Sequence, residues 1–221
     1  MLGPGARRRA ARPVVDPLEP TAFAEAAALL ARAFRDNPLN VAVIGAGASA
    51  RRRERCNAVV MRNLLRVAAG SGVLLGVRYA GVLAGGLVAA PPYGFPFPAP
   101  GVGAQLRALL VQGLRVAARW REAFERLQRR RPIEAHAYLG LLGVEPSLQR
   151  RGVGAAALEA WLARVDADGL PAYLETDREE NLRFYGRVGF GIVGEIEVLG
   201  ARVWCMRRPP AMAVSVAAAL R

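Results

Sequence analysis

The sequence is poor in the residues that build metal sites and disulfide frameworks. It has one histidine, His136, and two cysteines, Cys56 and Cys205, which lie far apart and form no C-x-x-C motif. A zinc site or a disulfide scaffold needs several such residues at short spacing, so we predict no metal and no disulfide framework. Two isolated cysteines are typical of a reducing, cytoplasmic setting.

Long apolar runs are also missing. No window approaches the ~20 uninterrupted apolar residues that a membrane-spanning helix needs. The arginines at positions 7–9 are not followed by the apolar stretch of a signal peptide. We therefore expect a soluble protein without a membrane partner.

Lysine is absent, so all 31 basic residues are arginines. The formal net charge of +13 favours anionic ligands, including the phosphates of a nucleotide cofactor, but does not identify one. The arginines are scattered over the predicted elements and no nucleic-acid recognition motif is present, so we predict no nucleic-acid partner. A basic binding protein without catalysis remains an alternative.

Length and composition indicate one domain. The chain has 221 residues, of which 53% are hydrophobic, enough for a single core. We predict a domain over residues 13–209, preceded by a basic flexible tail at 1–12 and followed by a C-terminal tail at 210–221. Monomer and homodimer are both compatible with the sequence.

The pattern of the N-terminal half predicts a strand, a hairpin and several helices. The expected elements are a strand at Val14-Val15, a helix from Phe23 to a stop at Asn37-Pro38, a helix from Ser49 to Gly70, a hairpin over 73–88 and a Pro-rich loop over 91–100. We expect the arginine run at 51–53 to lie on a solvated face, with a ligand-facing position as the alternative. Tyr93, Phe95 and Phe97 in the loop either line a substrate pocket or are buried in an ordered crossover.

A long helix follows this loop, and its apolar residues share one stripe. We assign that stripe to the core: Leu106, Leu109, Leu110, Ala117, Trp120, Phe124 and Leu127.

The C-terminal half alternates strands and helices. The expected elements are a strand over 135–144, a glycine loop, a helix, a strand at Ala172–Glu175, a short helix over 181–188 and a hairpin over 192–206. A strand, a helix and a strand at this spacing imply a parallel pair, whereas the hairpins are antiparallel. The predicted fold class is α/β (α+β), a mixed, mostly antiparallel twisted sheet with helices on both faces.

The strongest chemical signal is the loop Gln149-Arg150-Arg151-Gly152-Val153-Gly154 between a strand and a helix. Glycines let the backbone approach a phosphate closely, and the first amides of the helix offer N–H groups without partners. Arg150 and Arg151 add positive charge. The loop is not a P-loop, because the Gly-Lys-Ser/Thr ending is missing.

One alternative interpretation of this loop is a dinucleotide site. Gly152 to Ala157 matches G-x-G-x-x-G/A, and Glu175 ends the next strand near the spacing of a ribose-binding acid, as in a nicotinamide-dependent oxidoreductase. Against it, the polar connection 145–151 replaces a tight turn, and too little chain follows for more parallel units.

The order of motifs resembles the GNAT superfamily of N-acetyltransferases, and most closely its puromycin N-acetyltransferase type. The matching blocks are Leu142-Gly143-Val144-Glu145-Pro146, Gln149 to Gly154, Leu174-Glu175-Thr176, Asn181, Phe184-Tyr185, Gly189-Phe190 and Val203-Trp204-Cys205-Met206. The resemblance is specific from about Pro132 to Pro209. It implies transfer of an acetyl group from acetyl-CoA to the primary amine of a small molecule in a ternary complex, without a metal.

The resemblance also implies roles for individual residues. The central strand pair is splayed, and acetyl-CoA enters the gap. The cofactor-binding residues would be Leu142, Gly143, Val144, Gln149, Arg150, Arg151, Gly152, Val153, Gly154, Ala155 and Asn181. Tyr185 corresponds to the general acid that protonates the departing thiolate.

The sequence does not identify the residue that accepts a proton from the ammonium group of the acceptor. Glu175, on the strand next to the cleft, is the first candidate, with a structural hydrogen-bonding role as the alternative. His136 is the second candidate, because histidine is a common general base, although a lone histidine is often a surface or packing residue. Glu134 is the third.

Overall fold

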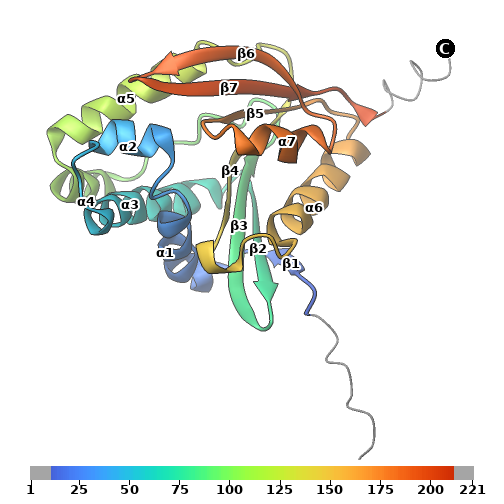
Figure 1. Cartoon of the computed structure of the whole chain (residues 1–221), viewed down its shortest axis with the longest axis horizontal. Coiled ribbons are helices and arrows are strands. Elements are labelled where there is room, and N and C mark those ends of the chain that lie inside the picture. The colour runs from blue at the N-terminus through green and yellow to red at the C-terminus, as the bar shows by residue number, and fades with distance from the viewer. Residues whose placement is uncertain (1–10, 212–221) are drawn as a thin grey trace, which may run out of the picture.

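The computed structural model describes residues 11–211, so most of the two expected tails lies outside the described residues. In this range a seven-stranded sheet runs through the molecule in the order β1-β2-β3-β4-β5-β7-β6 (Figure 1). The strands are β1 (Val14–Pro17), β2 (Val73–Tyr79), β3 (Val82–Ala90), β4 (Ala137–Val144), β5 (Ala172–Thr176), β6 (Gly191–Val198) and β7 (Ala201–Arg208).

Only β4 and β5 run parallel among the neighbouring strands of this sheet. The predicted mixed, mostly antiparallel sheet is therefore confirmed. A doubly wound dinucleotide fold needs a series of parallel strands. The sheet does not support the oxidoreductase alternative for this reason.

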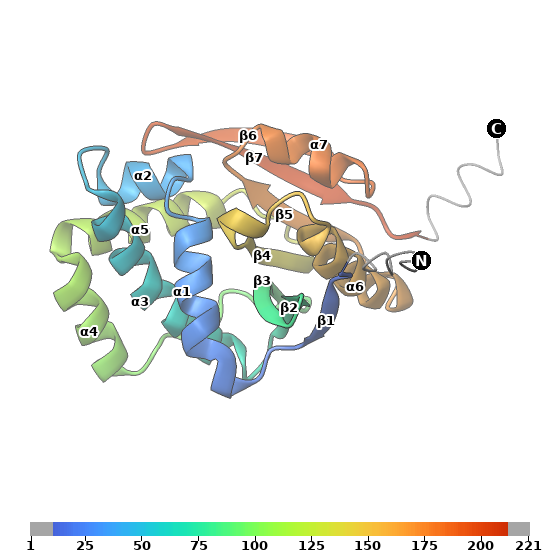
Figure 2. The same cartoon turned by 60° about the horizontal axis from the view of Figure 1, so that its bottom comes forward.

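Helices cover both faces of the sheet, as predicted. They are α1 (Phe23–Ala33), α2 (Pro38–Ile44), α3 (Ala50–Ala68), α4 (Val102–Gln112), α5 (Leu114–Gln128), α6 (Val153–Ala167) and α7 (Glu180–Gly186). The α6 helix packs on one face through a core that includes Leu158 and Trp161, and α1 and α3 pack on the opposite face (Figure 2). A third cluster joins α2 and α5 to the β6–β7 hairpin.

The expected stop at Asn37-Pro38 ends one helix and begins another. The α1 helix ends at Ala33, Asn37 has an extended backbone, and Pro38 is the first residue of α2. Proline suits this position because its φ is already helical and the N–H it lacks would have no partner in the helix. The sequence prediction missed α2, since it treated the proline only as a breaker.

Gly113 divides the predicted long helix into α4 and α5. Its φ of +83° lies in the left-handed region, which glycine adopts without strain, and the chain changes direction there. Part of the predicted core stripe consequently faces outward: Leu106 and Leu110 are exposed, whereas Leu127 is buried. The assignment of the whole stripe to the core was wrong.

The arginine run at the start of α3 contacts protein rather than only solvent. Arg53 donates to Asp36 Oδ1 at 2.7 Å and to the carbonyl oxygen of Arg35 at 3.1 Å. Arg52 donates to the carbonyl oxygen of Gln112 at 3.3 Å. These contacts attach α3 to the end of α1 and to α4. Arg51 and Arg52 are nevertheless exposed, as expected, and only Arg53 departs from the expected solvated face.

Candidate active site

The two central strands separate after three residue pairs. Their parallel register begins at Ala137 with Ala172 and ends at Leu139 with Leu174. Beyond that point β4 continues to Val144 and keeps β3 as its partner. We call the gap between residues 141–144 of β4 and the end of β5 the splay.

A β-bulge lies where the splay begins. In the β3–β4 register Val88 is opposite Leu141 and Ala89 is opposite Leu139, so Gly140 is the extra residue. A bulge bends its strand and increases the local twist. The bulge accounts for the divergence of β4 from β5, and the edge of β4 toward β5 is left without a strand partner in the described sheet.

The 149–154 loop ends beside this free edge. Gly152 has φ +81° and immediately precedes α6. The first helical bond runs from Ala156 N to Gly152 O at 2.9 Å, so the N–H groups of residues 153–155 have no partner within the helix. A Cβ on Gly154 would lie 3.4 Å from Val144 Cγ2 and 3.7 Å from Phe184 Cζ, so β4, α6 and α7 meet here.

The 149–154 loop has the positive charge and the free N–H groups that suit an anion. Gln149, Arg150 and Arg151 are exposed, and the unpaired amides stand at the positive end of the α6 dipole. Arg150 has a φ of +61°, a strained conformation for a residue with a side chain. The guanidinium of Arg151 lies 5.7 Å from the ring centroid of Tyr79 on β2. A diphosphate therefore fits these residues by charge and by hydrogen-bonding capacity.

Tyr185 lies on α7 and is only 7% exposed. Its ring packs edge-on against Phe184 and Phe190. Burial raises the pKa of its hydroxyl well above the ordinary value, and the nearby Asp177 carboxylate raises that pKa further. The hydroxyl makes no hydrogen bond to any residue within 11–211, so its O–H is free to donate a hydrogen bond to a ligand.

Asn181 lies one turn before Tyr185 on α7. Its side-chain Nδ2 donates to Thr176 Oγ1, at the end of β5, over 3.1 Å. This bond fixes the start of α7 to the strand that borders the splay. The side-chain oxygen of Asn181 remains available for a ligand.

Glu175 is held in a buried ion pair on the other face of the sheet. Leu174 packs in the α6-side core, so the next side chain points the opposite way. Its carboxylate accepts from Arg131 Nε at 2.9 Å and from the Tyr138 hydroxyl at 2.7 Å. Arg131 Nη2 also donates to the Tyr138 oxygen at 2.8 Å, and the Arg131 and Glu175 side chains are 10% and 6% exposed. Both carboxylate oxygens are occupied, which favours the structural role.

The structure places His136 and Glu134 away from the splay. His136 immediately precedes β4, at the end of that strand opposite to Val144, and its Nδ1 lies 2.7 Å from the carbonyl oxygen of Glu134. Its ring contacts Tyr173 edge-on. Neither residue is brought together with Tyr185.

Asp177 is a site residue that the sequence reasoning missed. Its Oδ2 accepts from the backbone N–H of Leu39 at 2.8 Å, and its Oδ1 accepts from Asn37 Nδ2 at 3.2 Å. Asp177 thus caps the start of α2 and ties it to the end of β5. Burial raises the pKa of its carboxyl, and the hydrogen bond from Leu39 opposes that rise. A polar residue directly after a buried strand was the available signal.

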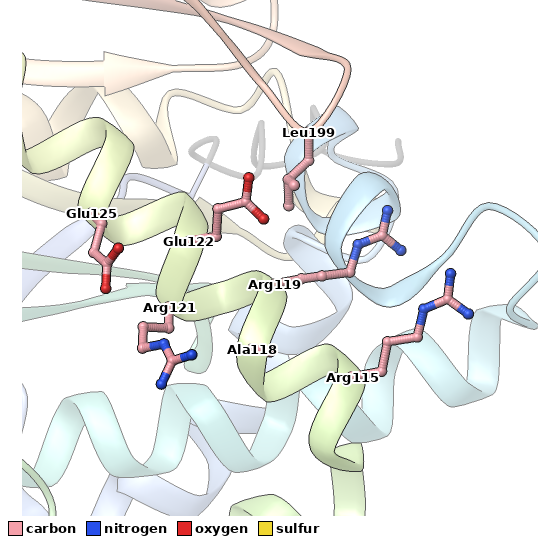
Figure 3. Close-up of a pocket in the computed structure, with 7 residues that line it drawn as sticks. All are labelled: Arg115, Ala118, Arg119, Arg121, Glu122, Glu125 and Leu199. Atoms are coloured by element: carbon pink, nitrogen blue, oxygen red, sulfur yellow. The ribbon is translucent and has the colours of Figure 1, made fainter.

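Two hollows open on the α5 side of the described structure. One, of about 230 Å³, is lined by Tyr93 and Phe95 of the loop, by Arg131, and by Glu134, His136 and Tyr138 next to β4. The other, of about 540 Å³, is a broad hollow between α5 and the turn at Leu199 (Figure 3). In Figure 3, Arg115 and Arg119 point toward α2 while Glu122 points toward Leu199. Neither hollow is the splay.

In residues 11–211 no group of His, Cys, Asp or Glu is arranged to hold a metal ion. Within the same residues no helix has the length and apolar character required to cross a bilayer.

The splay and the 149–154 loop thus place an open strand edge beside free backbone N–H groups. The sequence matches the profile of the acetyltransferase (GNAT) family over residues 48–190, and the chain belongs to that family. It is a GNAT N-acetyltransferase.

Solved structures share the fold at low sequence identity. A histone acetyltransferase HPA2 and related acetyltransferase from Corynebacterium glutamicum is 22% identical, with a TM-score of 0.69, over 90% of this chain and 97% of that chain. The polyamine N-acetyltransferase of Drosophila melanogaster is 14% identical, with a TM-score of 0.58, over 89% and 99%. The PaiA N-acetyltransferase of Thermoplasma acidophilum, solved with coenzyme A, is 12% identical, with a TM-score of 0.55, over 90% and 99%.

Proposed function

We propose that this protein transfers an acetyl group from acetyl-CoA to the primary amine of a small molecule. The observation that carries the proposal is the unpaired edge of β4, which ends against the free amides of α6. A linear donor with a diphosphate at one end and a thioester at the other matches this pairing of an anion site with an open strand edge. The neighbour solved with coenzyme A supports the choice of donor.

In the proposed complex the diphosphate binds the N–H groups of residues 153–155 and the loop from Gln149 to Gly152. The arm of the cofactor lies along Leu142, Gly143 and Val144 as an added strand, with Asn181 beside it. Its thioester oxygen accepts from a backbone N–H of β4, which stabilises negative charge on that oxygen as the amine attacks.

The chemical step is a direct acyl transfer. The neutral amine attacks the thioester carbon, a C–N bond forms and the C–S bond breaks. The departing thiolate takes a proton from the Tyr185 hydroxyl, the amine gives up a proton to a base or to water, and the Tyr185 phenolate then regains a proton from water. Glu175 and His136 are the proposed bases. Because the Glu175 carboxylate is already paired with Arg131, a water molecule would carry the proton from the amine to Glu175.

A small-molecule amine of the puromycin type is the proposed acceptor class. The loop residues Tyr93 and Phe95 line the 230 Å³ hollow together with Tyr138, on the same face of the sheet as Glu175. Aromatic walls favour an acceptor with a flat, apolar part. The polyamine N-acetyltransferase among the similar structures supports an amine of low molecular mass as well.

A reducing, cytoplasmic location fits the same proposal. Cys56 and Cys205 are both buried and both free. Burial raises the pKa of each thiol, which keeps it protonated and unreactive.

A panel of primary amines, including puromycin and agmatine, tests the proposal directly. With acetyl-CoA present, we expect thiol release that depends on one of these amines, together with a product heavier by one acetyl group. Acetyl-CoA should raise the melting temperature of the protein and NADH should not. No thermal shift with acetyl-CoA would contradict the donor, whereas a shift without thiol release would contradict the acceptor class.

A further inference from the structure

The α4 helix buries almost none of its apolar side chains. Of its residues only Gln112 is buried. Val102, Leu106 and Leu110 follow one another at intervals of four along the helix, and Leu114 opens α5 four residues later. These four side chains, which we call the α4 face, are between 55% and 81% exposed. An 11-residue helix is marginal by itself in water, so something other than apolar packing fixes it.

Polar bonds to α3 hold α4 in this orientation. Asn63 Nδ2 donates to the carbonyl oxygen of Ala104 at 3.3 Å, and Gln112 Nε2 donates to the carbonyl oxygen of Cys56 at 3.2 Å. Arg52 donates to the carbonyl oxygen of Gln112 at the end of the helix. The helix is therefore anchored by its polar side, and the α4 face is turned to the outside by the same contacts.

The α4 face belongs to a stretch of sequence that carries arginines but no acidic residue. The sequence contains no Asp or Glu between Glu54 and Glu122. Arg66 on α3, Arg107 on α4 and Arg115 on α5 are exposed within that stretch. Arg115 also lines a hollow with Glu122 and Glu125 of α5. Exposed aliphatic side chains beside arginines are typical of a surface that lies on an anionic bilayer.

The charges near the α4 face favour one kind of partner for it over others. Two copies of this chain joined through the α4 face would bring Arg107 of each copy together on helices that carry no acidic residue. A nucleic acid would pair with the arginines but leave four aliphatic side chains in water. An anionic lipid surface can bind the aliphatic side chains and the arginines together. The aliphatic side chains enter the outer part of the acyl chains, while the guanidinium groups stay among the lipid phosphates.

We propose that the α4 face is a peripheral docking surface for anionic lipid bilayers. The α4 helix lies at the opposite end of the molecule from α6, as both views show (Figures 1 and 2). Docking through α4 leaves the 149–154 loop open to acetyl-CoA from the aqueous side. This proposal departs from the sequence analysis, which expected no membrane partner and assigned Leu106 and Leu110 to the core.

Co-sedimentation of the full chain with vesicles tests the proposal. One set of vesicles contains phosphatidylcholine alone and the other contains equal parts of phosphatidylcholine and phosphatidylglycerol. We expect binding to the anionic set only. The double variant Leu106→Gln/Leu110→Gln should weaken that binding by about tenfold or more, because both side chains would otherwise enter the bilayer.

A matched control comes from the edge strand β6. Ile192 and Val193 are 54% and 59% exposed, so Ile192→Gln/Val193→Gln removes similar apolar surface far from α4. This control should bind vesicles like the parent, and both double variants should keep the parent's melting temperature. Equal binding by the α4 variant and the parent would overturn the proposal, as would an absence of binding to anionic vesicles. So would a parent dimer that the α4 variant converts to a monomer, since a second copy would then be the occupant.

Discussion

Two regions of the molecule differ in how directly the sequence specifies them. Over residues 132–209 the strands, the loop and the short helix carry local signals, and β4, α6 and α7 meet as those signals predict. Over residues 91–131 the same reasoning found a long helix with a buried stripe, whereas the chain forms two helices with leucines outside.

The difference lies in what fixes each region. The cofactor region depends on backbone geometry, since Gly140 forms the bulge and Gly152 adopts a positive φ. Such requirements are visible in the residue types themselves. In the 91–131 segment the orientation of α4 depends on side chains of α3, notably Asn63 and Arg52, which are distant in sequence.

The largest effect expected in the cofactor region is the loss of turnover in Tyr185→Phe. Removing the hydroxyl removes the proposed proton donor to the thiolate, so kcat should fall by about 10²–10⁴-fold. The dissociation constant for acetyl-CoA should stay near that of the parent, because the phenyl ring still packs against Phe184 and Phe190. Steady-state kinetics and acetyl-CoA titration check both values. Parent-like turnover in the variant would leave the general acid unassigned.

Glu175→Gln tests the contact that joins the two regions. Glu175 belongs to β5, whereas Arg131 follows α5, and the substitution leaves the buried guanidinium without its counter-charge. We expect the free energy of unfolding to fall by about 3–5 kcal/mol, measured by denaturant titration.

Turnover per folded molecule separates the two roles of Glu175. If the ion pair is structural, turnover in Glu175→Gln should stay within a few fold of the parent, and the added substitution Arg131→Met should restore part of the lost stability. A large loss of kcat with parent-like stability would instead identify Glu175 as the base.

The parts of the site with local sequence signals could be predicted, whereas the parts that depend on contacts between distant segments could not. The resemblance supplied Tyr185 and the 149–154 loop, whose roles stay predictions, and the structure brings Phe184, the neighbour of Tyr185, beside Gly154. Asp177 was missed because its partners, Asn37 and the N–H of Leu39, come from a helix that the sequence prediction did not contain. The Arg131–Glu175 pair was missed because ion pairs between distant segments leave no periodic pattern in the chain.

Gly152→Val should weaken acetyl-CoA binding by about tenfold. A β-branched residue is strained at a φ of +81°, by roughly 1–2 kcal/mol, so the loop loses the conformation that presents its amides. Gly169→Val is a matched control, because Gly169 has a φ of +63° at the far end of α6 and a Cβ added there would meet no atom within 4 Å. We expect the control to lose stability but not affinity, as measured by calorimetric titration. Equal losses of affinity in the two variants would contradict the placement of the phosphates.

Asp177 gives the smallest expected effect, a change in how stability depends on pH. Burial raises its pKa above the ordinary value of 3.8, so the folded state holds this proton more tightly than the unfolded state. The stabilisation is complete below pH 3.8 and is lost as the pH rises through the raised pKa. Melting temperatures over this window should therefore fall less steeply in Asp177→Asn than in the parent. Asp168→Asn, at an exposed position, should keep the parent slope. The same slope in all three proteins would mean that the carboxyl of Asp177 is not shielded from water, and that α2 is held to β5 by other contacts.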